Sequence, residues 1–255
     1  MTERSGSVRG QPSEKSRPKR SWARFFFEWG IVVVGLVILV AVLPPNLRDR
    51  AKEAVRRAQC RENLKQISLA LHNYQEAYGS LPPAYLVDTK GNRLHSWRTL
   101  ILPYLDQKLL YEKIDLSKPW DDPANAQARS TPVTAYRCPS AGLGATRTTY
   151  LAFTGDDFCF APTRGRTLDE ITDGLSKTVM ILESDTSHSV DWMSPYDERS
   201  QSFPLFSIKT PQEVHPGGTY VTLADGSVRF IRTGVSRGTR RALMTIAGGE
   251  QVREY

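Results

Sequence analysis

FFFEWGIVVVGLVILVAVL, residues 25–43, and LRDRAKEAVRRAQCRENLKQISLALHNYQEAY, residues 47–78, lie on either side of a Pro44–Pro45 pair. The first stretch has 19 residues, and Glu28 is its only charged residue. A helix of that length measures about 28 Å, which is close to the thickness of the hydrocarbon layer of a membrane. The sequence therefore predicts a transmembrane helix within residues 25–45.

The second stretch has the pattern of an amphipathic helix. Its apolar residues recur mostly three or four positions apart, at Leu47, Ala51, Ala54, Ala58, Leu64, Ile67, Leu71, Tyr74 and Tyr78. The mixed charges on its other face are typical of a solvated surface with ion pairs or, alternatively, of contact with lipid headgroups. Gly79 and Pro82–Pro83 predict its end.

The segment of residues 1–24 carries seven Lys or Arg residues and two Glu residues, and it has few large apolar side chains. We expect it to be a disordered tail, because it cannot bury enough apolar surface to fold. A basic tail before a span places the N-terminus in the cytoplasm and sends residues 46–255 across the cytoplasmic membrane as one extracytoplasmic domain. A cleaved secretory signal fits less well because the apolar run continues into Pro44–Pro45, and a buried core helix fits less well because the run is apolar on every face.

The rest of the chain has an ordinary charge balance. Residues 29–255 carry 27 basic and 24 acidic side chains, so most of the net charge of +7 lies in the tail. A body of this composition gives no sign of a nucleic-acid partner.

Beyond Pro83 the sequence predicts short elements separated by turns. We expect a second helix at about 96–113, interrupted by Pro103, strands at 148–153, 178–183, 219–224 and 227–232, and a closing helix at 239–246. Asp225–Gly226 between the last two strands predicts a hairpin with a type I′ turn. The fold class is therefore α+β, a long N-terminal helix packed on a small, mainly antiparallel sheet.

A series of short sequence motifs, which we call the family's words, gives the chain its family resemblance. These words are Arg57-Ala-Gln-Cys60, Asn63-Leu-Lys-Gln66, Leu71-His-Asn-Tyr74, Gly79-Ser-Leu-Pro-Pro83, His95-Ser-Trp-Arg98, Leu102-Pro-Tyr-Leu105, Trp120-Asp-Asp-Pro123, Tyr136-Arg-Cys-Pro-Ser140, Ile171-Thr-Asp-Gly174 and His215-Pro-Gly-Gly218 through Ala224-Asp-Gly-Ser-Val228. Over about residues 25–250 the chain resembles the DUF1559 family, which has a prepilin-type N-terminus and an H-X9-DG motif. Here His215, Asp225 and Gly226 form that motif. The resemblance implies a pilin-like or pseudopilin-like architecture.

The N-terminus departs from the family pattern. If Glu28 is aligned with the family's glutamate, prepilin cleavage would fall between Ala23 and Arg24, where Arg24 replaces an apolar residue. Pro45 then lies 17 residues beyond Glu28, where such helices commonly carry a proline. We therefore expect an uncleaved signal anchor, with Glu28 either at the membrane interface or in an assembly contact.

Three cysteines, Cys60, Cys138 and Cys159, show no CxxC and no spacing typical of metal ligands. From the residues alone, an exported domain would hold one disulfide and one spare thiol, with Cys60–Cys138 and Cys138–Cys159 both open. Because Cys60 and Cys138 lie in the family's words and Cys159 does not, the resemblance implies the Cys60–Cys138 pair.

Candidate chemical residues have simpler structural explanations. His215 and Asp225 could form an acid/base pair or half of a metal site, but Asp225 suits the hairpin turn and His215 a tight turn before the strand. His72 lies beside the apolar stripe and is expected to pack there. No Walker A, GxSxG or HExxH pattern is present. We expect no catalytic residue, no cofactor and no metal ligand.

These observations favour a membrane-anchored structural or assembly protein over an enzyme. Its expected partners are the lipid bilayer and either further copies of itself or other pilin-like subunits. The alternative is a membrane-tethered extracytoplasmic module that binds an unidentified ligand.

Overall fold

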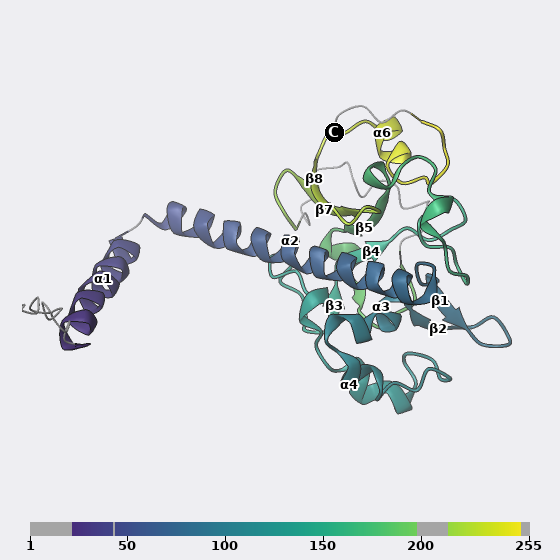
Figure 1. Ribbon diagram of the computed structural model, residues 1–255, viewed down its shortest axis with the longest axis horizontal. Coiled ribbons are helices and arrows are strands. Elements are labelled where there is room, and N and C mark those ends of the chain that lie inside the picture. Colours follow the sequence, from purple (N-terminus) through teal and green to yellow (C-terminus); the bar gives the residue numbers. More distant parts are fainter. Residues whose placement is uncertain (1–21, 43, 198–213, 251–255) are drawn as a thin grey trace, which may run out of the picture. The chain divides into compact units, whose positions relative to one another are not determined.

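The computed structural model describes residues 22–42, 44–197 and 214–250 (Figure 1). The chain forms two compact units, residues 1–51 and residues 52–255. The predicted disordered tail lies outside the described residues as far as residue 21.

The first unit contains helix α1, Trp22–Val42, which covers most of the predicted span. Among its described side chains, those from Ile31 to Val34 are all more than half exposed. Glu28 is exposed in the same helix. Within the residues that the structure describes, no helix meets the length and apolarity that crossing a bilayer requires.

Helix α2 covers Pro45–Tyr78. Its first residue, Pro45, is the proline that lies 17 residues beyond Glu28. A proline is well suited to the first helical position, because it has no N–H and its φ is already helical. The helix ends where predicted. Gly79 adopts a φ of +75°, and its N–H donates to the carbonyl of Gln75 at 2.8 Å.

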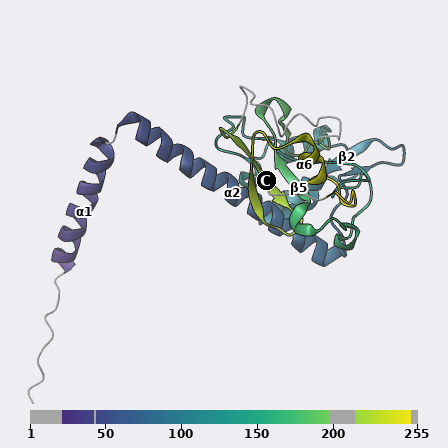
Figure 2. The ribbon, with the colours of Figure 1, turned by 90° about the horizontal axis from the view of Figure 1, so that it is seen from above.

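One face of α2 is buried against the rest of the second unit, and Figure 2 shows this part of the helix running along the body. The buried apolar side chains of this face are Cys60, Leu64, Ile67, Ala70 and Leu71. Each fully buried leucine or isoleucine stabilises the fold by about 1.5–3 kcal/mol.

The main sheet has four antiparallel strands in the order β4-β5-β7-β8. Their bounds are Tyr150–Ala152, Val179–Glu183, Gly218–Leu223 and Val228–Arg232. Two smaller antiparallel pairs accompany it: β1, Tyr85–Val87, with β2, Arg93–Ser96, and β3, Arg147–Thr148, with β6, Val190–Asp191. The predicted strand 148–153 is thus divided between two sheets, because β3 pairs with β6 and β4 pairs with β5.

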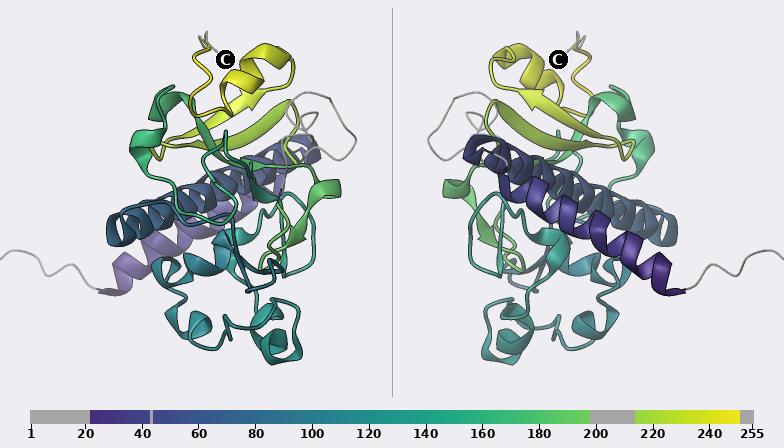
Figure 3. Two further views of the ribbon diagram at one scale, coloured as in Figure 1. Left: turned by 90° about the vertical axis from the view of Figure 1, so that its right-hand side faces the viewer. Right: turned by 90° about the vertical axis from the view of Figure 1, so that its left-hand side faces the viewer.

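Both faces of the main sheet are covered. Tyr220 and Ala224 pack with the core that includes α2, whereas Val221 and Leu223 pack with Leu243 beyond helix α6, Arg237–Ala242. Figure 3 shows the sheet between these two helices. Helix α6 begins two residues before its predicted start, because the hydroxyl of Ser236 accepts the N–H of Thr239 and caps it.

The β7–β8 hairpin forms at Asp225–Gly226, but the type I′ turn predicted there is wrong. Gly226 has a φ of +87°, whereas Asp106 is the only non-glycine residue with positive φ in the described chain. Asp225 instead stabilises the turn through its carboxylate, which accepts the Ser227 N–H at 2.9 Å and its hydroxyl at 2.7 Å.

The helix predicted at 96–113 is interrupted around Pro103 as expected, but it is also broken a second time, at Asp106. It is broken into α3, Trp97–Leu100, the 3₁₀ turn η1, Leu102–Leu105, and α4, Lys108–Tyr111. Pro103 lies at the start of η1, and Asp106 adopts a left-handed conformation with a φ of 58°, so a continuous helix cannot pass through either position. The remaining short helical turns are α5, Ala126–Arg129, η2, Pro123–Asn125, η3, Thr134–Tyr136, η4, Leu168–Glu170, η5, Leu175–Lys177, and η6, Thr186–His188.

Glu170 in η4 should make the domain sensitive to acid. Its carboxylate accepts hydrogen bonds from Arg164 and from the Thr167 N–H, and together with the charge of Arg166 these lower its pKa to about 2. A depressed pKa stabilises the fold above the ordinary value of 4.5 and loses that effect as the pH falls toward 2. Glu170→Gln should therefore lower the Tm at neutral pH. The difference in Tm between this variant and the wild type should shrink as the pH falls from 4.5 to about 2.

Thermal unfolding followed by circular dichroism at several pH values measures this difference. The matched control is Glu76→Gln, which changes an exposed carboxylate on α2. A difference between wild type and Glu170→Gln that stays constant from neutral pH down to pH 2 would contradict the prediction.

Candidate functional site

His215 is buried between two carboxylates that come from different elements. Its Nδ1 lies 3.1 Å from Oε1 of Glu53 on α2, and its Nε2 lies 3.2 Å from Oε2 of Glu183, the last residue of β5. The side chains of His215 and Glu183 are almost completely buried, whereas Glu53 keeps a quarter of its side chain exposed. The imidazole therefore joins the helix to the central strand.

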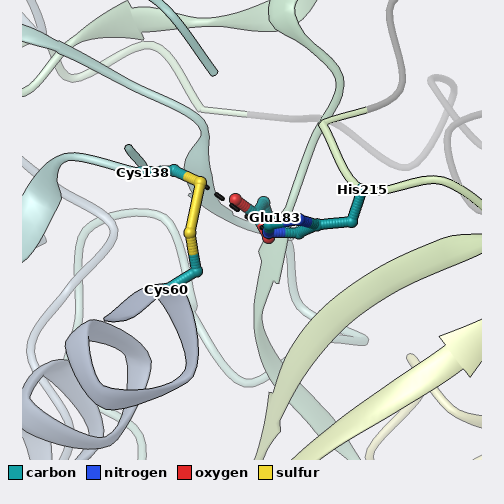
Figure 4. A group of neighbouring side chains, drawn as sticks. All are labelled: Cys60, Cys138, Glu183 and His215. Atoms are coloured by element: carbon teal, nitrogen blue, oxygen red, sulfur yellow. Dashed lines mark hydrogen bonds and ion pairs between the residues drawn. A yellow bond between two sulfur atoms is a disulfide. The ribbon is translucent and has the colours of Figure 1, made fainter. Parts of the chain in front are cut away.

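A disulfide lies beside this imidazole, as Figure 4 shows. It joins Cys60 on α2 to Cys138, with the two Cα atoms 5.3 Å apart. The Sγ of Cys138 is 3.8 Å from Nε2 of His215. The structure thus joins the pair of cysteines that the family resemblance implied. We call Glu53, Cys60, Cys138, Glu183 and His215 the His215 cluster.

The third cysteine, Cys159, is free and buried. Burial raises the pKa of its thiol to about 12. Because the thiolate is the reactive form of cysteine, Cys159 should be inert in the folded protein.

The two carboxylates of the His215 cluster differ electrostatically. Partial burial opposes ionisation of Glu53, but hydrogen bonds from His215, Arg56 and Arg57 outweigh it and lower its pKa. Complete burial dominates at Glu183 and raises its pKa despite the neighbouring imidazole. Burial alone would lower the pKa of His215, but Glu183 and Glu53 together raise it. Glu53 is therefore the more readily ionised of the two carboxylates.

Two further contacts lie around the His215 cluster. Arg57, one turn after Glu53, donates to the carbonyl of Pro216 at 3.0 Å. The ring of Tyr220 meets the imidazole edge to face, with centroids 5.2 Å apart. In this disulfide form both imidazole nitrogens face carboxylates in a buried setting, which suits a structural clamp between α2 and the sheet.

The H-X9-DG motif does not bring its two ends together. His215 precedes β7 and Asp225 follows it, so the six residues of the strand separate them by about 20 Å. Gly226 serves the turn. The alternative of a His215–Asp225 pair, which the sequence already disfavoured, does not form, because an extended strand holds its two ends apart.

The other histidines have local partners. His72 faces the carbonyls of Ser68 and Ala224, at 2.9 and 3.1 Å, which fits the packed role predicted for it. His95, for which the sequence suggested no partner, lies 2.8 Å from the carbonyl of Lys118. His188 faces the carboxylate of Asp185, which caps η6.

Sequence reasoning missed both carboxylates of the cluster. Glu53 is one charge among many on α2, so no pattern distinguishes it. Glu183 gave a weak signal, because it ends a strand whose four preceding residues are all apolar and buried. A carboxylate that continues a buried strand needs a partner.

Comparison with known proteins gives one family. Residues 49–157 match the family model described as a protein of unknown function, DUF1559, which confirms the resemblance over this segment. This segment includes Glu53, Cys60 and Cys138, whereas Glu183 and His215 lie beyond it. No curated protein and no solved structure matches the chain.

Proposed function

We propose that the chain is a membrane-anchored, pilin-like or pseudopilin-like assembly protein. The starting point is the match of residues 49–157 to the DUF1559 family model. The apolar segment of residues 25–43 anchors the chain in the cytoplasmic membrane with the N-terminus in the cytoplasm. The domain from residue 46 onward lies outside and makes the surface contacts of the assembly. Its function is structural rather than catalytic.

The observation that carries this proposal is the exposed apolar surface of α1. Four consecutive residues, Ile31 to Val34, are each 55–59% exposed, and four residues at 100° each cover the whole circumference of a helix. Water is a poor solvent for such a surface. Lipid and neighbouring α1 helices of other copies are the two environments that match it.

Two further features support the exported location. The basic residues cluster before α1, as the positive-inside rule requires of a cytoplasmic N-terminus. The Cys60–Cys138 disulfide is a bond that persists in oxidising compartments and is rare in the cytosol.

Topology is the first test. An alkaline phosphatase fused after residue 46 should be active, because that enzyme matures only outside the cytoplasm. Protease added to spheroplasts should remove the domain of residues 52–255 from the full-length chain. The control is the same fusion on a chain in which residues 25–43 are deleted, which should be inactive. A protected domain together with an inactive full fusion would contradict the proposal.

Assembly is tested separately by crosslinking within the membrane. Val33→Cys, on exposed α1, should give disulfide-linked dimers under mild oxidation if α1 helices pack together. The matched control is Leu69→Cys, which is exposed on α2. If the protein is exported but forms no dimer with a cysteine at any position along α1, the proposed membrane anchor still stands. The proposed assembly through α1 is then contradicted.

A second candidate function is supported by a group of tyrosines at the end of α2. The rings of Tyr74 and Tyr78 are tilted by 34° with centroids 4.4 Å apart, Tyr104 meets Tyr74 edge to face, and Tyr78 is 65% exposed. An exposed aromatic ring offers a flat apolar face on which the ring of a ligand such as a sugar can pack. If the protein is a tethered binding module, it should bind sugars on a glycan array, and Tyr78→Ala should abolish that binding. If it is only an assembly protein, the wild type should bind no glycan.

A further inference from the structure

The His215 cluster gathers four donor groups of the kinds that bind zinc. One sulfur each from Cys60 and Cys138, a carboxylate oxygen of Glu183 and a ring nitrogen of His215 all lie within 4.8 Å of one another, and all four residues are buried. Thiolate, imidazole and carboxylate are the ligands of protein zinc sites.

The distances between these donors are close to those of a tetrahedral site. Zinc–ligand bonds of about 2.0–2.3 Å place neighbouring donors roughly 3.3–3.8 Å apart. Here Nε2 of His215 is 3.2 Å from Glu183 Oε2 and 3.8 Å from Cys138 Sγ. The two sulfurs, which are bonded to each other in this form, separate by rotation of their side chains once the bond is broken.

The opposite side of the imidazole already has the arrangement of a metal-bound histidine. The carboxylate of Glu53 faces Nδ1 of His215 and can hold a proton there. The lone pair of Nε2 then points toward the other three donors. Metal-ligating histidines commonly donate their other N–H to a carboxylate in this way.

Glu183 supplies an independent indication of a ligand. Both oxygens of its buried carboxylate lack a hydrogen-bond donor that satisfies normal geometry, although Nε2 of His215 is nearby. A buried carboxylate without such donors is costly unless a cation or a proton compensates it. Figure 4 shows the side chain of Glu183 beside the imidazole and near the disulfide.

We propose that the reduced form of the protein binds one Zn²⁺ through Cys60, Cys138, Glu183 and His215, with Glu53 as the residue that positions His215. A dithiol reductant breaks the Cys60–Cys138 bond, gives two thiols and leaves as its own disulfide. Zinc then displaces the two thiol protons. Oxidation of the two thiolates by a disulfide reforms the bond and releases the ion, so the cluster alternates between a disulfide and a zinc clamp.

The test uses the full-length chain in mild detergent. One sample is kept oxidised and another is reduced with a phosphine, which offers no thiols of its own. Both are incubated with Zn²⁺ alone and desalted, and the zinc per chain is measured by elemental mass spectrometry. We expect one zinc per reduced chain and none in the oxidised sample. Co²⁺ in place of zinc should give the intense visible bands of a tetrahedral site and a near-ultraviolet thiolate band.

Variants separate the proposed ligands from other donors. Cys138→Ser should abolish zinc uptake, whereas Cys159→Ser, a matched change at the free buried cysteine, should leave it unchanged. Glu183→Gln should weaken it without affecting the disulfide. Glu53→Gln should weaken the affinity about 10-fold while the cobalt bands keep their positions, because an outer partner orients the ligand without binding the ion.

Three results would overturn the proposal. These are a folded reduced chain that binds no zinc, equal zinc uptake by Cys138→Ser, and bound cobalt without a thiolate band. If reduction unfolds the chain, refolding is compared with and without Zn²⁺. Recovery of the native circular dichroism only with the ion would support the site, and failure in both samples would count against it.

Discussion

Replacing Cys60 and Cys138 together by alanine should lower the free energy of unfolding by about 4.5 kcal/mol. The disulfide spans 78 positions of sequence, and the chain-entropy model assigns about this value to a closed loop of that length. For a domain of this size the loss corresponds to a fall in Tm of roughly 10–15 °C. The reason lies chiefly in the unfolded chain, which gains freedom when α2 is no longer tied to residue 138.

Urea unfolding in the presence of a chelator, followed by tryptophan fluorescence, measures this loss. Cys159→Ala is the matched control, since it removes a buried cysteine that forms no bridge. The control should cost about 1–2 kcal/mol or less, the size of a small core truncation. A double variant that is no less stable than the control would mean that the Cys60–Cys138 bond does not form in the folded protein.

Asp197→Ala should be nearly as damaging, at about 3–5 kcal/mol. Arg98 has no exposed side-chain surface, and its Nη2 lies 2.5 Å from Oδ1 of Asp197, which is itself only 2% exposed. Arginine stays charged at any accessible pH, so removal of the carboxylate leaves an uncompensated buried cation. Asp197 also accepts the indole N–H of Trp97 at 2.6 Å and the N–H of Ala152 at 3.0 Å.

The control for this prediction is Asp121→Ala, at an exposed loop carboxylate, which should change stability by no more than about 0.5 kcal/mol. Asp197→Asn should fall between the two, because an amide oxygen can still accept the Trp97 N–H but carries no charge. Equal stabilities for Asp197→Ala and Asp121→Ala would show that Arg98 reaches another anion or solvent.

The local elements of the second unit were largely predictable. Helix α2 ends before Gly79 as expected and begins two residues before the predicted Leu47, and the hairpin forms at Asp225–Gly226. Such features depend on residues a few positions apart. The break of the 96–113 helix at Pro103 was predicted, but the turn type and the second break at Asp106 were not, because both depend on the φ of individual residues.

The cluster was predictable only in part. Cys60, Cys138 and His215 stood out because they lie in the short motifs shared with the family, and the sequence assigned Asp225 to the hairpin turn rather than to His215. The actual partners, Glu53 and Glu183, carried no distinctive pattern. The absence of metal-ligand spacing was likewise uninformative about zinc, because the four donors come from four separate segments.

The sequence by itself determined what is local or statistical: the apolar run of residues 25–43, the end of α2, the hairpin, the α+β class and the resemblance to DUF1559. Only the tertiary structure decided that Glu53 meets His215 across 162 positions of sequence. The physical reason is that periodicity and capping act over a few residues. Which side chains share a buried site depends instead on how α2 packs against the sheet, and that packing is set by the whole core at once.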